Sequence, residues 1–155
     1  IRDRCNPHKI EGGMAEALNG ADIFIGVSGP GVVTEEMVRN MNKDAIVLAM
    51  ANPVPEIYPD EAKRAGARVV GTGRSDFPNQ VNNVSVFPGL FRGALDVRAK
   101  KITDNMKLAA ARAIADAVET IDEDNILPHA FDLSVSKKVA EAVAEAARKD
   151  GVARI

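Results

Sequence analysis

Three short segments carry polar residues of the kind that bind small ligands. Ser28 and Gly29 lie in the glycine-rich stretch 26–31, Asn52 stands directly before Pro53, and Asn82 and Asn83 are adjacent amides. A glycine-rich turn lets a phosphate or carboxylate approach backbone N–H groups. A carboxamide offers a donor and an acceptor, which suits ligands that mix hydroxyl and carboxylate groups. These residue types predict binding of a small, polar, partly anionic molecule.

Each segment also has a purely structural explanation. The glycine spacing departs from Gly-x-Gly-x-x-Gly, and Pro30 removes one backbone donor, so the stretch also suits a plain tight turn. Asn-Pro pairs commonly start turns, and loop amides commonly cap their own backbone. The residues taken alone therefore leave binding and structural interpretations open.

Other reactive side chains stand apart from one another in the sequence. His8, His129 and Cys5 have no partner at a metal-ligand or catalytic spacing, and Tyr58 lies in a loop without a recognisable motif. We therefore predict that this chain contains no catalytic residue and no metal ligand.

The elements that position the polar segments form a repeat. Apolar runs at 23–27, 45–50 and 68–70 each end in a polar loop. Helical stretches lie between them, the first capped by Thr34 and the second ended by Gly66. Continuous rather than alternating hydrophobicity predicts parallel strands that are covered on both faces. Right-handed crossovers bring the carboxyl ends of such strands to one edge, where open α/β sheets bind ligands. The fold class expected is α/β, a partial Rossmann-like parallel sheet of three strands with C-terminal helices.

Helical patterns flank the three strands. Asn6-Pro7 suggests the start of a helix that reaches Leu18 and ends at Gly20. After the strands the pattern is helical at 90–97, from a cap at Thr103, and again at 134–149, where Val135, Val139 and Val143 form one apolar stripe. We expect one domain over 1–155, with strands and loops in 1–87 and a helical tail in 88–155.

Composition excludes several classes of protein. The 155 residues are 46% hydrophobic and 27% charged, with a net charge of −2, which argues against nucleic-acid binding. No apolar run approaches the roughly 20 residues of a membrane span, and the first residues do not resemble a signal peptide. A single cysteine suits a reducing compartment, so a cytoplasmic location is expected. Because residue 1 is Ile rather than Met, the chain is interpreted as an excerpt of a longer protein.

Longer motifs resemble those of bacterial malic enzymes over nearly the whole chain. They are Asp3–Pro7, Gly12–Leu18, Gly26–Ser28, Ala51–Pro53, Gly71–Asn83, Phe87–Gly89 and Arg92–Asp96. The resemblance implies an oxidoreductase that converts malate to pyruvate and CO2 with NAD or NADP and a divalent metal, Mg²⁺ or Mn²⁺. Hydride transfer to nicotinamide would be followed by metal-assisted decarboxylation.

The resemblance implies roles for the polar segments. Ser28 and Gly29 match the loop along the dinucleotide, and Asn52 matches an asparagine at the junction of cofactor and substrate. Asn82 and Asn83 match the asparagine pair that reaches the malate carboxylate. The family's catalytic tyrosine and lysine, its metal-binding carboxylates and its phosphate fingerprint belong to segments upstream of this sequence.

The chain therefore resembles the C-terminal half of the NAD(P)-binding domain and is expected to be inactive without the remainder of the malic enzyme chain. We expect Ser28, Asn52 and the Asn82–Asn83 segment to converge on one rim. An uncovered sheet edge also predicts association, with a homo-oligomer as the expected state. Two alternatives remain: the cofactor domain of another nicotinamide dehydrogenase, and a non-catalytic association module.

Overall fold

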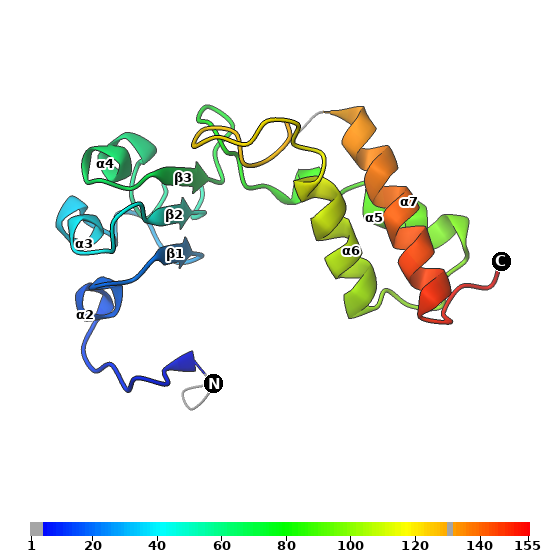
Figure 1. The fold of residues 1–155 in the computed structure, drawn as a ribbon, viewed down its shortest axis with the longest axis horizontal. Coiled ribbons are helices and arrows are strands. Elements are labelled where there is room, and N and C mark those ends of the chain that lie inside the picture. The colour runs from blue at the N-terminus through cyan, green and yellow to red at the C-terminus, as the bar shows by residue number, and fades with distance from the viewer. Residues whose placement is uncertain (1–4, 130–131) are drawn as a thin grey trace. The chain divides into compact units, whose positions relative to one another are not determined.

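The computed structural model describes residues 5–129 and 132–155 and divides into two compact units. The first unit runs to Val81 and contains all the strands, and the second begins at Asn82 and is helical. Figure 1 shows the sheet of the first unit and the helices of the second.

The sheet of the first unit has three parallel strands in the order β1-β2-β3. They are β1 (Ile23–Gly26), β2 (Ile46–Ala49) and β3 (Val69–Thr72), and their arrowheads point the same way in Figure 1. The three strands begin at the same level of the sheet, because Ile23 pairs with Ile46 and Ile46 with Val69. The predicted α/β, Rossmann-like parallel sheet is confirmed.

Short helices connect the strands: α2 (Met14–Leu18) precedes β1, α3 (Glu35–Arg39) joins β1 to β2, and α4 (Pro59–Arg64) joins β2 to β3. The cap predicted at Thr34 is confirmed, since its hydroxyl accepts the Met37 N–H at 3.3 Å. Gly66 follows α4 with a φ of +107°, as its predicted place at a helix end requires.

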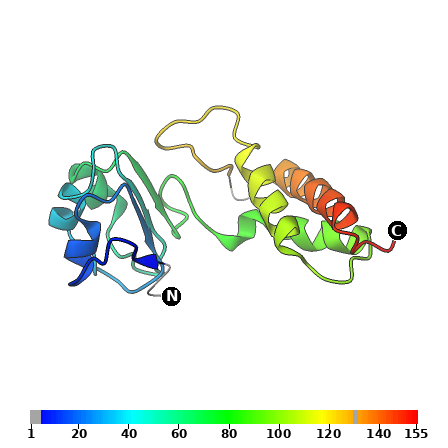
Figure 2. The same ribbon diagram turned by 60° about the horizontal axis from the view of Figure 1, so that its bottom comes forward.

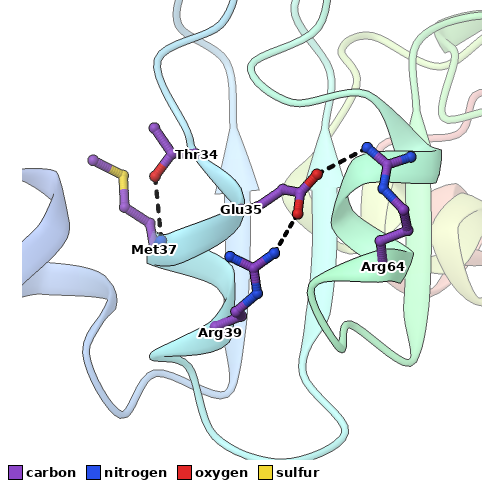
Figure 3. Close-up of polar contacts among 5 residues, drawn as sticks. All are labelled: Thr34, Glu35, Met37, Arg39 and Arg64. Atoms are coloured by element: carbon purple, nitrogen blue, oxygen red, sulfur yellow. Dashed lines mark hydrogen bonds and ion pairs between the residues drawn. The ribbon is translucent and has the colours of Figure 1, made fainter.

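One carboxylate links two of these helices (Figure 3). Glu35 accepts from Arg39 on its own helix and from Arg64 of α4, the latter at 2.8 Å. The Arg64 hydrogen bond is the main cause that lowers the pKa of Glu35. The contact is exposed, so it orients α3 and α4 more than it stabilises them.

One face of this sheet is covered by the described helices, and the other face is exposed at β1. Phe24, Val47 and Val70 pack with all three helices in a single core. Ile23 and Ile25 point the other way and are 54% and 62% exposed. Both crossovers run in the same sense along the sheet and so place their helices on the same face. The prediction that both faces are covered is therefore wrong at β1 within this chain.

The predicted helix from Asn6 to Leu18 is also wrong over its first half. The Asn6 side chain donates to the Ile10 carbonyl at 2.8 Å and accepts the Ile10 N–H at 2.9 Å, which closes a turn. Gly12 then takes a φ of +119°, and the helix begins at Met14. Side-chain competition for the backbone therefore outweighed the apolar periodicity.

The second unit contains η1 (Asn83–Ser85), α5 (Gly89–Asp96), α6 (Asp104–Ala115) and α7 (Leu133–Lys149). Helix α7 packs against both α5 and α6, as Figure 2 shows, through the predicted stripe of Val135, Val139 and Val143. The cap predicted at Thr103 is confirmed, because its hydroxyl accepts the Met106 N–H at 3.2 Å. Among the described helices, none is long and apolar enough to cross a membrane.

Candidate functional site

The three strands end together, and their following loops share one edge of the sheet. Gly26 pairs with Ala49, and Ala49 pairs with Thr72, so the Ser28 loop and the Asn52 loop both follow strand ends at this edge. Ser28 and Asn52 are exposed, and Gly29 is half-buried. The predicted common edge is confirmed for these residues.

A buried carboxylate joins the two loops. Glu56 is 0% exposed, and its Oε1 accepts the Ser28 N–H at 2.7 Å and the Ser28 hydroxyl at 3.1 Å. Its Oε2 accepts the Ala51 N–H at 3.0 Å, one residue before Asn52. The Glu56 backbone carbonyl also accepts the Val33 N–H at 3.0 Å, beyond the glycine-rich turn. Glu56 therefore holds both candidate ligand loops at once.

This arrangement explains Gly26 at the end of β1. A Cβ added at Gly26 would lie 2.6 Å from Cδ of Glu56 and 2.8 Å from Cε1 of Phe24. The Glu56 side chain is buried and bound at both oxygens, so it cannot swing aside freely. Glycine is needed here for close approach of a carboxylate.

The hydrogen bonds keep Glu56 ionised despite its burial. Burial raises the pKa of the Glu56 carboxyl, but the N–H groups of Ser28 and Ala51 and the Ser28 hydroxyl lower it further. The net pKa lies below the ordinary value. A negative charge thus lies directly beneath the two loops.

A second bridge reaches the Asn52 loop from the end of β3. Arg74 donates to both oxygens of Asp76, at 2.9 and 2.7 Å, and to the Pro53 carbonyl at 3.0 Å. The Arg74 hydrogen bond is the main cause that lowers the pKa of Asp76. Loops following β1, β2 and β3 are therefore connected through the segment 51–56.

The stretch after Asp76 returns to run beside β3. Buried Asn79 donates to the Val70 carbonyl at 3.0 Å, and the Val81 N–H donates to Thr72 at 2.8 Å. Thr72 itself is the last residue of β3 and is fully buried, so its side chain does not contribute to the exposed edge. Asn79 has a structural role.

Asn82 and Asn83 open the second unit and are both exposed. The Asn82 Oδ1 accepts the Val84 N–H at 3.0 Å and caps η1. This agrees with the structural explanation given above, in which a loop amide caps its own backbone. The carboxamide also has an amide group, which is a donor, and Asn83 offers the same chemistry. Capping and ligand binding can therefore use different atoms of Asn82.

Sequence reasoning did not single out Glu56. The available signal was one acidic residue in the otherwise apolar stretch from Pro53 to Ile57, directly after the candidate loop. Burial of such a residue requires partners, and loop N–H groups are the nearest donors.

The described part of the chain shows no cluster of side chains that suits a metal ion. No group of three His, Cys, Asp or Glu side chains there could hold a metal ion. Cys5 is exposed, and Tyr58 is the residue before α4.

Comparison with known proteins places this fold and these loops in one family. The family model described as "Malic enzyme, NAD binding domain" matches residues 13–148. The bifunctional malic/malolactic enzyme of Bacillus subtilis is 56% identical over 97% of this chain and 37% of its own length. The NADP-dependent malic enzyme of Halomonas elongata is 46% identical over 91% of the chain and 37% of its own length.

Solved structures agree with these sequence matches. The malic enzyme from Pyrococcus horikoshii is 58% identical, with a TM-score of 0.92, over 96% of this chain and 35% of that one. The chain thus spans little more than a third of the relatives described here. Because the family model covers most of its length, the chain belongs to the malic enzyme NAD-binding domain family.

Proposed function

We propose that this chain supplies dinucleotide and malate contacts in an enzyme that oxidatively decarboxylates malate to pyruvate and CO2. The match to the malic enzyme NAD-binding domain over residues 13–148 carries this proposal. Relatives are named NAD-dependent and NADP-dependent malic enzymes, so either dinucleotide remains a candidate cofactor. The loops at the carboxyl edge of the sheet are where this fold class binds such ligands.

The residues at this edge fit a dinucleotide. Ser28 and Asn52 are exposed, and a Cβ placed on Gly29 would meet no atom within 4 Å. Open space beside a glycine lets a ligand lie close to the backbone. When bound, the oxidised nicotinamide supplies a hydride acceptor.

Asn82 and Asn83 are proposed to bind the malate carboxylate through their side-chain amide groups, with Asn52 between the dinucleotide and malate. A carboxamide donates to a carboxylate without adding charge. These asparagines hold and orient the substrate; they do not transfer protons.

The described residues do not fit the divalent metal, since no suitable group of ligands occurs among them. The Mg²⁺ or Mn²⁺ ligands and the proton-transfer groups are therefore assigned to the remainder of the malic enzyme chain. We place the enzyme in the cytoplasm, where a single unpaired cysteine is stable, and propose a homo-oligomer.

The test compares the 155-residue chain with the full-length enzyme. With malate, Mg²⁺ or Mn²⁺, and NAD or NADP, the full-length protein is expected to form reduced cofactor and pyruvate, and the 155-residue chain neither. Failure of the full-length protein on malate, with turnover of an amino acid instead, would support another dehydrogenase. Turnover of malate by the short chain would overturn the assigned division of roles.

A further inference from the structure

We propose that Glu56 is a positioning residue that fixes the Ser28 and Asn52 loops in the geometry that binds the dinucleotide, an inference that rests on the proposed function. Glu56 does not reach the edge itself, because its side chain is fully buried. It acts through Ser28 and through the backbone that carries Asn52.

The bonding pattern requires an ionised carboxylate rather than any side chain of similar size. Two backbone N–H groups and one hydroxyl all point at the Glu56 oxygens, so both oxygens must accept. Glutamine has the same shape but presents one acceptor and one donor. In Glu56→Gln, either the Ser28 or the Ala51 N–H would face another N–H group.

Glu56 also determines what Ser28 can offer a ligand. Because the Ser28 hydroxyl hydrogen points to Glu56, the exposed side of Oγ presents only lone pairs. An acceptor over a buried negative charge favours a ligand group that donates, such as a ribose hydroxyl or an amide N–H. It disfavours a phosphate oxygen. The bonding of Ser28 thus favours a hydroxyl- or amide-bearing part of the dinucleotide at this position.

Loss of the bridge lowers the fraction of molecules whose loops are in the binding geometry. Apparent affinity falls by that fraction, so loops that are correct a tenth of the time weaken binding about tenfold. The effect falls on the dinucleotide KM. A variant that merely reduces the amount of folded enzyme would lower kcat and leave KM unchanged.

The experiment measures steady-state kinetics and direct NAD and NADP binding in the full-length enzyme that carries this chain. Glu56→Gln is expected to raise the dinucleotide KM and Kd about tenfold or more. Gly26→Ala keeps the carboxylate but pushes it away, and is expected to act in the same direction. If Glu56→Gln does not fold, the dinucleotide KM and Kd of Gly26→Ala test the role of Glu56.

Matched controls separate this role from general damage. Glu61→Gln changes a carboxylate that accepts the Tyr58 N–H at the start of its own helix, at 3.2 Å. Gly13→Ala adds a methyl that meets its nearest atom, Glu16 Oε2, at 3.5 Å. Both controls are expected to keep the wild-type dinucleotide KM.

The outcomes distinguish this inference from the proposed function. Dinucleotide binding that weakens in both test variants supports the role of Glu56, even if the enzyme acts on a substrate other than malate. Malate turnover with a dinucleotide KM unchanged in both test variants overturns the role of Glu56 and leaves the function standing. Absence of dinucleotide binding by the wild type overturns both.

Discussion

Asn82 illustrates how one side chain combines a structural and a binding role. Its oxygen accepts the Val84 N–H and caps η1, while its amide group is the part assigned to malate. Replacement by alanine removes both groups together. Replacement by aspartate keeps the capping oxygen, because aspartate is also a good cap, but it exchanges the amide donor for a second oxygen and adds a negative charge that repels a carboxylate.

We therefore predict that, in the full-length enzyme, Asn82→Asp raises the malate KM at least as much as Asn82→Ala does. A lost hydrogen bond to a charged group costs about 1.5–3 kcal/mol, which corresponds to roughly 10- to 150-fold. The dinucleotide KM should change little, whereas Ser28 and Gly29 substitutions should act mainly on it. Steady-state kinetics with each substrate varied in turn measures both constants. Wild-type malate kinetics in Asn82→Ala and Asn83→Ala would exclude the assignment.

Glu56 gives a second prediction, on acid stability. The pKa of Glu56 is lower in the folded chain than in the unfolded one. The ionised carboxylate therefore stabilises the fold fully above the unfolded pKa of about 4.3. The contribution is lost as the pH falls through the lowered folded value. The difference in unfolding free energy between wild type and Glu56→Gln should be largest near neutral pH and shrink in acid. Denaturant titrations at several pH values test this, and a pH-independent difference would contradict it.

Contacts between elements set how tightly the helices of the second unit can pack. A Cβ on Gly93 of α5 would lie 2.3 Å from the Ala140 carbonyl oxygen and 2.9 Å from Val143 Cβ, both on α7. The obstacle at Ala140 is backbone, so relief requires the helices to move apart.

We predict that Gly93→Ala destabilises the protein by about 1–3 kcal/mol, the usual cost of overpacking. Leu95→Ala is the matched control, because Leu95 lies on the same helix and is 72% exposed. It should change stability by only about 0.5 kcal/mol. Chemical denaturation measures both, and equal effects for the two variants would show that α5 and α7 are not in close contact.

The sequence predicted those elements whose signals are local. Caps at Thr34 and Thr103 and the turn at Gly66 depend on neighbours within a few residues, and the structure has all three. The helix expected from Asn6 failed because its side chain bonds to Ile10 and competes with helix formation.

Contacts between distant positions were not accessible in the same way. The Glu56–Ser28 hydrogen bond joins residues 28 positions apart, and neither residue type indicates which residue it will bond to. Edge placement of Ser28 and Asn52 was predictable, because it follows from parallel topology. The approach of Asn82 and Asn83 to that edge stays a prediction.

At the scale of the whole molecule, the sheet face that is exposed at β1 is the apolar surface most in need of a covering partner. Ile23 and Ile25 present apolar side chains on an edge strand, and in the described residues β1 pairs with β2 alone. An exposed apolar strand edge favours association. In the full-length enzyme, we expect the remainder of the polypeptide to cover this face.

We predict that the 155-residue chain, expressed alone, sediments as an oligomer and that Ile25→Lys shifts it toward monomer. A charge on the exposed face opposes pairing of two apolar surfaces. Ile121→Lys is the control, because Ile121 is 73% exposed but lies in a loop of the second unit. Analytical ultracentrifugation over a concentration range measures the change. A monomeric wild type would contradict the prediction, because the exposed apolar face would then not cause self-association.

The contact between Gly26 and Glu56 has a consequence for how this sequence can diverge. A side chain at position 26 and a long carboxylate at position 56 require the same space, as the 2.6 Å separation shows. A relative that acquires a larger residue at the first position must therefore shorten or lose the acid at the second. The two sites should covary across homologues although 30 positions separate them, and a lineage that changes both must find another way to hold its loops.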